Sequence, residues 1–456
     1  MKRFETDSIG TLEIPQDAYY GVQTLRGYKN FRITERLPNY NFILNIVKIK
    51  KAAAIANKKL NCYDEKIANA IIMTCDEILA GKFKDEFITD TIQGGAGTTF
   101  NMNVNEVIAN RATEILGGTK GEYLVHPNDH VNCSQSTNDV VPSAGKLTVL
   151  DLAISLLKSL KILIQELEKK AMDFDDILKM GRTQLEDAVP IRLGQEFGAY
   201  AEALKRNYER IDSVLDEMRI LNIGGTAIGT AINTKKSYSE ETILNLCEIT
   251  GYNLSVAKNL IDSTQNIDAF SLVSSILKTL ATNLSKMCND FRLMASGPKT
   301  GFMEINLPPM QNGSSIMPGK VNPVIPEVVS QVAFAVLGND VTISMAVEGG
   351  QLELNAFEPV IFDRLFDSLI SLKRAMDTLT YNCVVGITAN KERCEELVYN
   401  SVGIVTALTP HLGYKASADI AKEALKKNKK IKELVLEKGL LEKGLLEEIL
   451  NPYSMT

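Results

Sequence analysis

Residues 147–170 read LTVLDLAISLLKSLKILIQELEKK, and the spacing of the apolar side chains in this stretch decides the fold class. Apolar residues recur largely at steps of three and four, and lysines and glutamates stand between them. The apolar set consists of Leu147, Leu150, Ala153, Ile154, Leu157, Ile164 and Leu167. Because one face of an α-helix returns every 3.6 residues, this pattern predicts a long amphipathic helix.

The same helical spacing continues to about residue 390, and strand signals are nearly absent in this part of the chain. The predicted helical segments are 144–171, 192–220, 254–295, 326–349 and 357–387. Helices of about 25–40 residues would be ~40–60 Å long at their usual rise per residue, which is longer than a small domain is wide. We therefore predict a mainly α fold with a central bundle of five long helices.

The fourth of these segments carries small and apolar side chains around much of its circumference, as VVSQVAFAVL at 328–337 shows. A helix that is apolar on most sides must be buried, and association of subunits is one way to bury it.

The chain on either side of the bundle is more mixed. The N-terminal part contains helix-like stretches at 44–60 and 101–117 and a glycine-rich turn at 94–97. After about residue 390 the pattern shortens to small amphipathic helices. The predicted domains are residues 1–134, 135–389 and 390–456.

Composition and charge exclude several classes of function. The chain has 456 residues, 45% of them hydrophobic, with a formal charge of −6 and a pI near 5.5. This balance gives no general attraction for nucleic acid or for an acidic membrane surface, so an anionic substrate needs locally placed cations and backbone donors. Seven scattered cysteines without a C-x-x-C pair, and only three histidines, favour reduced thiols over a zinc site. The sequence shows neither a signal peptide nor an uncharged apolar run of about 18 residues, so we expect a cytoplasmic protein.

Four stretches are dense in hydroxyls, amides or glycines: QGGAGTT (93–99), SQSTND (134–139), GRTQLED (181–187) and GSSIMPGKVNP (313–323). Helix ends carry unpaired backbone N–H groups, so a polar connector can both cap a helix and present donors to an anion. Capping explains one such stretch. Four of them indicate a site, because three sit at bundle connectors and are expected to converge at the bundle ends.

The glycines in these stretches do not fit the nucleotide-binding motifs. Five residues, where a phosphate-binding loop needs four, separate Gly313 from Gly319 and Lys320. Phe100 stands where a dinucleotide fingerprint beginning at Gly95 needs its third glycine.

The stretch GSSIMPGKVNP at 313–323 resembles the signature loop of the aspartase/fumarase superfamily. The resemblance covers nearly the whole chain, through DAYYGVQTLR (17–26), HPNDHV (126–131), GTAIGT (225–230), GITANK (386–391) and NSVGI (400–404). It implies a three-domain, mainly α fold. It also implies a homotetramer with a twenty-helix core and active sites built from three subunits.

The resemblance further implies a reaction in which a proton leaves the carbon next to a carboxylate and the group on the neighbouring carbon is then expelled, leaving fumarate. The intermediate is an aci-carboxylate, whose extra negative charge needs preorganised donors. Ser314 matches the general base, activated as an oxyanion by the N–H groups of its loop and by cationic charge such as that of Lys320.

The implied substrate contacts divide by the group that they bind. They are Thr98, Ser136, Thr137 and the backbone around Ser315 for the β-carboxylate, Thr183, Lys320 and Asn322 for the α-carboxylate, and Asn138 and Thr98 for the amino group. Glu327 matches an acid near the site that would orient Lys320, and Arg26 would supply a further cation. Taken singly, each hydroxyl or amide also fits a cap or turn residue.

Gln184 separates the branches of the superfamily. Fumarases similar to this chain carry a histidine after Gly-Arg-Thr, which suits the handling of water, whereas an amide does not titrate. Because some aspartases also carry histidine there, Gln184 argues against fumarase more than it argues for aspartase. Stretches such as YGVQTLR (20–26) and ILKMGRT (177–183) resemble the aspartase branch more closely.

The expected substrate and products are therefore L-aspartate, fumarate and ammonium, with Gln184 among the substrate contacts. The expected reaction needs no organic cofactor, although the resemblance allows Mg²⁺ as an activator. The alternatives left open are a class II fumarase-type hydratase and a catalytically silent structural protein with this fold.

Overall fold

The computed structural model describes residues 2–313 and 315–456, except that only the backbone is described at residues 452 and 454. The chain is mainly helical and divides into two compact units. Unit 1 comprises residues 1–157, 210–279 and 335–371, and unit 2 comprises residues 158–209, 280–334 and 372–456. The boundaries of the three predicted domains stay a prediction.

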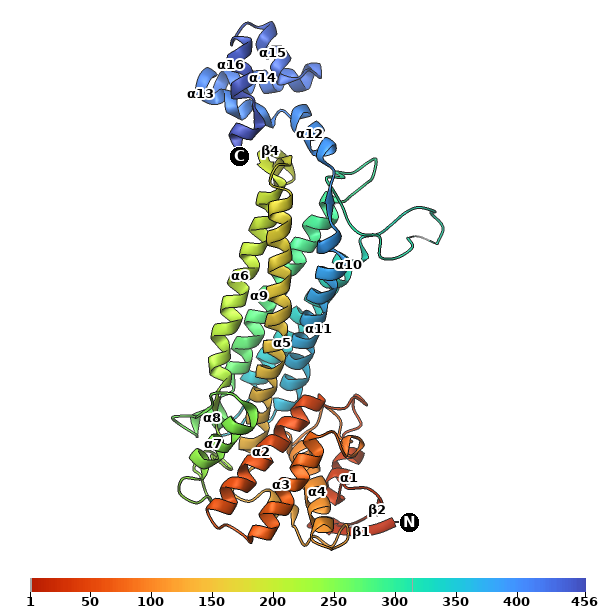
Figure 1. The fold of residues 1–456 in the computed structure, drawn as a ribbon, viewed down its shortest axis with the longest axis vertical. Coiled ribbons are helices and arrows are strands. Elements are labelled where there is room, and N and C mark those ends of the chain that lie inside the picture. The colour runs from red at the N-terminus through yellow and green to blue at the C-terminus, as the bar shows by residue number, and fades with distance from the viewer. Residues whose placement is uncertain (1, 314) are drawn as a thin grey trace. The chain divides into compact units, whose positions relative to one another are not determined.

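Five long helices confirm the bundle helices predicted from the sequence (Figure 1). They are α5 (Thr137–Asp173), α6 (Leu193–Met218), α9 (Asp268–Met294), α10 (Val324–Glu348) and α11 (Glu358–Asn382). The third predicted segment was too long at its N-terminal end. The side chain of Asn259 accepts hydrogen bonds from the N–H groups of Ile261 and Asp262, and this local turn competes with a continuous helix.

Unit 1 begins with an antiparallel hairpin and contains the helices of the N-terminal part, together with short elements between residues 220 and 265. These elements are β1 (Lys2–Asp7), β2 (Gly10–Pro15), α1 (Val22–Asn30), α2 (Tyr40–Lys59), α3 (Glu65–Leu79), α4 (Thr98–Ile115), β5 (Ile220–Leu221), α7 (Tyr238–Thr250), β6 (Ser255–Val256) and α8 (Asp262–Gln265). Helices α2 and α4 confirm the two helix-like stretches predicted in this region. The ring of Phe42 in α2 lies 5.3 Å from that of Phe100 in α4 and 5.4 Å from that of Phe362 in α11. This aromatic contact fixes the first turn of α4 against a bundle helix.

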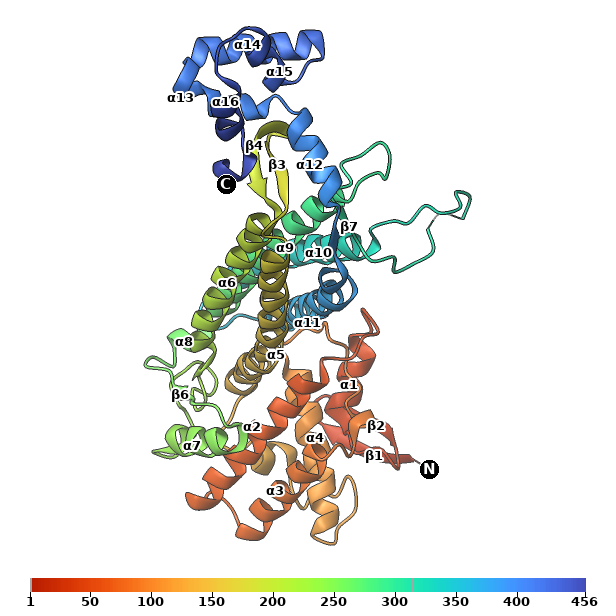
Figure 2. The ribbon, with the colours of Figure 1, turned by 45° about the horizontal axis from the view of Figure 1, so that its top comes forward.

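Unit 2 contains an antiparallel hairpin that the sequence pattern did not predict (Figure 2). Its strands are β3 (Leu178–Thr183) and β4 (Glu186–Arg192), and the expectation that strands are nearly absent here was wrong. Neither strand alternates strictly between apolar and polar residues, so the pattern that marks a half-buried strand is missing, and the tight turn between the strands sets their pairing.

The remaining elements of unit 2 are short. They are β7 (Ile305–Asn306), β8 (Thr388–Ala389), α12 (Lys391–Asn400), α13 (Thr409–Leu412), α14 (Tyr414–Lys427), α15 (Ile431–Glu437) and α16 (Lys443–Ile449). The C-terminal helices share one hydrophobic cluster, which includes Leu408, Ile420 and Val435 and also takes in Met180 from β3. This cluster joins the β3–β4 hairpin to the C-terminal helices.

Helix α10 is the one helix among the described residues that is long and apolar enough to be a candidate membrane span, with 39% of the most apolar window buried. It also carries buried polar residues. Asn339 donates to Asp367 and Ser368 of α11, and Asp340 accepts from Ser274 of α9. These bonds join α10 to two other bundle helices within unit 1.

Candidate active site

The N-termini of α4 and α5 meet in unit 1, and both helices begin with a threonine. A Cβ added at Gly97, just before α4, would lie 2.8 Å from a methyl group of Val141 in α5, so only glycine allows this approach. One turn into α4, the amide of Asn101 donates to the hydroxyl of Thr137 at 3.2 Å. Two helix N-termini side by side concentrate unpaired N–H groups and positive dipole ends, which favours an anion.

Thr98 is placed by three consecutive residues in the left-handed region. The φ angles are +86° at Gly95, +53° at Ala96 and +81° at Gly97. Thr98 is exposed, and its hydroxyl donates to the carbonyl oxygen of Gly95 at 2.7 Å. In this arrangement the hydroxyl oxygen is available as an acceptor, which suits an ammonium group.

Ser136 caps α5. Its hydroxyl oxygen accepts from the N–H of Asn138 at 3.2 Å, and the carboxylate of Asp139 accepts from the N–H of Ser136 at 3.0 Å. This reciprocal arrangement is a capping box. The capping bond occupies a lone pair of the serine oxygen and leaves its proton to donate to a ligand. We call residues 134–138 the capping loop, and the structure confirms that this predicted connector caps the first long helix.

Asn138 ties the capping loop to residues 224–230, which we call the glycine loop. The side-chain amide of Asn138 donates to the carbonyl oxygen of Ala227 at 2.8 Å. Its Oδ1 accepts no hydrogen bond from any residue that the structure describes, so this oxygen can accept from a cationic amino group.

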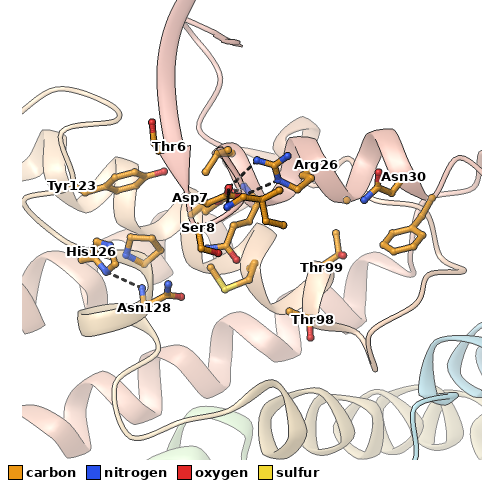
Figure 3. Close-up of a pocket in the computed structure, with 18 residues that line it drawn as sticks. Thr6, Asp7, Ser8, Arg26, Asn30, Thr98, Thr99, Tyr123, His126 and Asn128 are labelled. Carbon is orange, nitrogen blue, oxygen red and sulfur yellow. Dashed lines mark hydrogen bonds and ion pairs between the residues drawn. The ribbon is translucent and has the colours of Figure 1, made fainter. Parts of the chain in front are cut away.

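Arg26 and Thr98 line one cavity of about 540 Å³ (Figure 3). Arg26 forms a two-point ion pair with Asp7, at 2.8 and 3.0 Å, and also donates to the carbonyl oxygen of Gly10 at 3.2 Å. The hydrogen bonds from Arg26 hold the pKa of the Asp7 carboxyl below its ordinary value. The positive charge of Arg26 is therefore already paired within unit 1.

Glu106, which also lines this cavity, supports the start of α1, the helix that carries Arg26. The carboxylate accepts from the N–H groups of Gly21, Gln23 and Thr24 and from the hydroxyl of Thr24, at 2.6–3.0 Å. Burial raises the pKa of Glu106 to about 7, against the lowering effect of these hydrogen bonds. The carboxylate caps α1 from α4 and so fixes the backbone from which Arg26 extends.

In unit 2, Thr183 and Gln184 lie at the tip of the β3–β4 hairpin. Thr183 pairs with Glu186, and the two turn residues between them, Gln184 and Leu185, have φ angles of +56° and +68°. Two central residues with positive φ are typical of a tight hairpin turn. The side chains of Thr183 and Gln184 are exposed, so they are available to a ligand or to another chain.

The signature loop at residues 313–323 closes on itself. A Cβ added at Gly313 would lie 1.0 Å from the carbonyl oxygen of Lys320, so Gly313 packs against the backbone of Lys320 and only glycine fits. Ser315 and Lys320 are exposed. Ser314, the predicted base, lies outside the described residues.

The structure brings together only part of the predicted site within one unit. Thr98, Ser136, Thr137 and Asn138 lie at the two helix N-termini of unit 1, whereas Thr183, Gln184, Ser315, Lys320, Asn322 and Glu327 belong to unit 2. No ion pair joins Glu327 to Lys320 in the part of the chain that the structure describes, so the predicted orienting role of Glu327 gains no support from it.

A buried polar network beneath the capping loop was missed in the sequence. Lys50 is fully buried and donates to the side-chain oxygen of Asn132 at 2.9 Å. The same oxygen accepts from Asn101 at 3.1 Å, and Asn101 in turn donates to Thr137. The available signal was a lysine on the apolar face of a predicted helix. Its partners come from distant segments, which periodicity does not identify.

No group of three or more His, Cys, Asp or Glu side chains could hold a metal ion among residues 2–313 and 315–456.

Comparison with protein families places the chain in a class of enzymes. A family model described as "Lyase" matches residues 10–338, and one described as "Fumarase C C-terminus" matches residues 404–456. The chain therefore belongs to this lyase family, the aspartase/fumarase superfamily that its motifs resemble.

Among its relatives are aspartate ammonia-lyases. That of Helicobacter pylori is 53% identical over 99% of this chain and 97% of the relative. That of Bacillus sp. is 49% identical over 100% and 97%, and that of Escherichia coli K12 is 49% identical over 99% and 96%.

Solved structures agree with the fold. The fumarate lyase:delta crystallin from Brucella melitensis bound to cobalt has a TM-score of 0.96 and 48% identity, and the class II fumarase from Schistosoma mansoni has a TM-score of 0.96 and 37% identity. Both similarities cover 100% of this chain and 99% of the other chain. The mainly helical lyase fold predicted from the sequence is confirmed.

Proposed function

We propose that this chain is an aspartate ammonia-lyase, which eliminates ammonia reversibly from L-aspartate to give fumarate. The observation that carries the proposal is 53% identity to an aspartate ammonia-lyase over nearly the full length of both chains. The site geometry supports it, because the joined N-termini of α4 and α5 suit a carboxylate, and oxygens of Thr98 and Asn138 suit an ammonium group.

In the proposed reaction Ser314 removes a proton from the carbon next to the β-carboxylate. The electron pair of the broken C–H bond spreads onto the carboxylate oxygens, where hydroxyl protons of Ser136 and Thr137 and the helix dipoles stabilise it. The pair then forms the carbon–carbon double bond while the C–N bond breaks and ammonia leaves. The charge of Lys320 would bind the α-carboxylate, which does not react, with Thr183 and Asn322.

The leaving group decides between the two nearest reactions. The amino group of aspartate arrives as a cation and leaves as neutral ammonia, so acceptors such as Asn138 and Gln184 suffice. The hydroxyl of malate is a poorer leaving group unless an acid protonates it, and the amide of Gln184 cannot do so.

The test follows the ultraviolet absorbance of fumarate with L-aspartate, L-malate, adenylosuccinate and argininosuccinate at equal concentrations. We expect turnover of L-aspartate and negligible turnover of the other three. Faster turnover of L-malate would overturn the assignment in favour of a fumarase-type hydratase, and no turnover of any substrate would favour a silent structural protein.

The proposal includes a cytoplasmic homotetramer whose active sites are shared between subunits. Helix α10 supports it, because several of its large apolar side chains are exposed in the single chain, including Phe334 at 63%, Val341 at 59% and Met345 at 69%. These residues recur at a spacing that places them along one side of the helix. A second copy of the chain would cover them.

The proposed elimination needs no organic cofactor, because every step is a proton transfer or a bond cleavage that side chains and backbone donors support. Mg²⁺ is proposed only as an activator, and no step of the reaction is assigned to it.

A further inference from the structure

Asp139 is a carboxylate in the first turn of α5 that bonds both loops of the site in unit 1. One oxygen accepts from the N–H of Ser136 at 3.0 Å, and the other accepts from the N–H groups of Gly224 and Thr226 at 3.1 Å each. Asp139 is 1% exposed. Three backbone donors on one buried carboxylate therefore join the capping loop to the glycine loop.

Asn222 is a second anchor, because it holds the capping loop at another point. The buried amide of Asn222 donates to the carbonyl oxygen of Asn138 at 2.9 Å, while its side-chain oxygen accepts from Ser143 at 3.2 Å. The capping loop is thus held at Ser136 by Asp139 and at Asn138 by Asn222. These contacts fix the backbone on both sides of Thr137.

The charge of Asp139 is partly balanced by that of the buried Lys50. Burial raises the pKa of Asp139 to about 6 and lowers the pKa of Lys50 to about 7, and the opposite charge of each group partly offsets this effect. Lys50 reaches Thr137 through Asn132 and Asn101. A buried carboxylate is costly to desolvate, and asparagine would fill the same space at a lower cost, so the charge points to a role beyond packing.

We infer that Asp139 is a positioning residue, which holds the hydroxyl and N–H donors of Ser136 and Thr137 in the orientation that receives the substrate carboxylate. The inference rests on the proposed function and deepens it. Asp139 is buried behind the loop and acts through Ser136. Asn222 shares the task as the second anchor.

The decisive variant is Asp139→Asn. Asparagine has one side-chain oxygen, so it can accept from only one of the two loops, and its NH₂ group would face the N–H of the other. We expect kcat/KM for L-aspartate to fall about 10- to 100-fold, the usual effect of losing a hydrogen bond to a charged group, with kcat falling too because Ser136 and Thr137 stabilise the charge of the intermediate. The matched control is Asp151→Asn on the same helix, because Asp151 accepts from Asn45 and Tyr252 but bonds neither loop.

A double-mutant cycle separates positioning from general destabilisation. If Asp139 acts through Ser136, the substitution Ser136→Ala should lower kcat/KM strongly in the wild-type protein and only slightly in the Asp139→Asn background. A purely structural role of Asp139 would let the two effects multiply, and that result would overturn the inference. A wild-type kcat/KM in Asp139→Asn would overturn it too.

Failure of the proposed function gives a different result. If the wild-type protein forms no fumarate from L-aspartate, the proposed function falls, and the inference falls with it. If the wild-type protein is active and Asp139→Asn does not fold, Asn222→Ala takes its place. A fall in kcat/KM that is non-additive with Ser136→Ala is then expected, and a wild-type kcat/KM in Asn222→Ala would overturn the inference.

Discussion

In the proposed site, one hydroxyl group at Ser136 performs two tasks. Its oxygen accepts a hydrogen bond from the N–H of Asn138, one of the backbone donors that α5 leaves without a partner in its first turn. Its proton remains to donate to a carboxylate. The role of a helix cap and the role of a substrate contact are therefore compatible in one residue. In this site the cap sets the direction in which the donor points.

Ser314→Ala tests the proposed base. The substitution removes one small hydroxyl from a loop, so we expect normal folding and a loss of turnover of ~10²–10⁴-fold, the usual effect of removing an acid–base group. Ser315→Ala is the matched control, because the proposal uses only the backbone of that residue. Fumarate formation measures both variants. Near-normal turnover in Ser314→Ala would remove this serine from the mechanism.

Glu106 gives the stability of unit 1 a dependence on pH. Its pKa is raised from 4.5 to about 7 in the folded chain, so the folded state keeps a proton that the unfolded state loses between these values. The contribution of Glu106 to stability is therefore greatest below about pH 4.5, falls as pH rises towards 7, and is flat above it. The full change is on the order of 3 kcal/mol, at about 1.4 kcal/mol per pKa unit.

Glu106→Gln should remove this dependence, because an amide does not titrate. Urea unfolding of both proteins at several pH values measures it. The stability of the wild-type protein relative to the variant is expected to decline between pH 5 and pH 7. A constant difference across this range would contradict the prediction.

Within the signature loop, Gly313 packs against the backbone carbonyl of Lys320. Gly313→Ala would place a methyl group on a carbonyl oxygen and force the loop open. We expect about a 100-fold loss of turnover, since misplacement of a catalytic group by about 1 Å has such an effect, with little change in thermal stability because the loop is exposed.

Gly444→Ala in α16 is the control for this substitution, because a Cβ there meets no atom within 4 Å. It should change neither turnover nor melting temperature appreciably. Wild-type turnover in Gly313→Ala would show that closure of the loop is not needed.

Periodicity predicted the long helices because each buries one face, and a repeated apolar face is visible in the sequence. The β3–β4 hairpin escaped this reasoning, since Gln184 and Leu185 adopt a left-handed turn that neither residue type favours. Helix α9 was overextended because hydrophobic spacing continues across the turn at Asn259.

The candidate site was predicted unevenly for a related reason. Polar residues such as Thr98 and Ser136 are visible in the sequence as types that favour the start of a helix. The supporting groups are Lys50, Asp139 and Asn222, and their roles depend on contacts between distant segments. The spacing of residues within one segment does not predict those contacts.

At the scale of the whole molecule, the proposed sharing of sites can be tested by complementation. Thr98 belongs to unit 1, whereas Gly313 and Ser315, which flank the proposed base in the sequence, belong to unit 2. If these residues meet across chains, mixed tetramers of Ser314→Ala and Thr98→Ala subunits should recover activity, because some sites then contain neither substitution. Fumarate formation by purified mixed tetramers measures the recovery. Verified mixed tetramers without recovery would contradict sharing between these two residues.

The capping box at the start of α5 links the occupancy of the site to the fraying of a helix end. A ligand that takes a hydrogen bond from this first turn binds the ordered turn and not the frayed one, so it suppresses opening of the helix there. Amide hydrogen exchange at Asn138, Asp139 and Val140 would then slow as fumarate is added, while exchange at the far end of the same helix would not change. Occupancy of the site can thus be followed in the protein backbone itself, without any turnover.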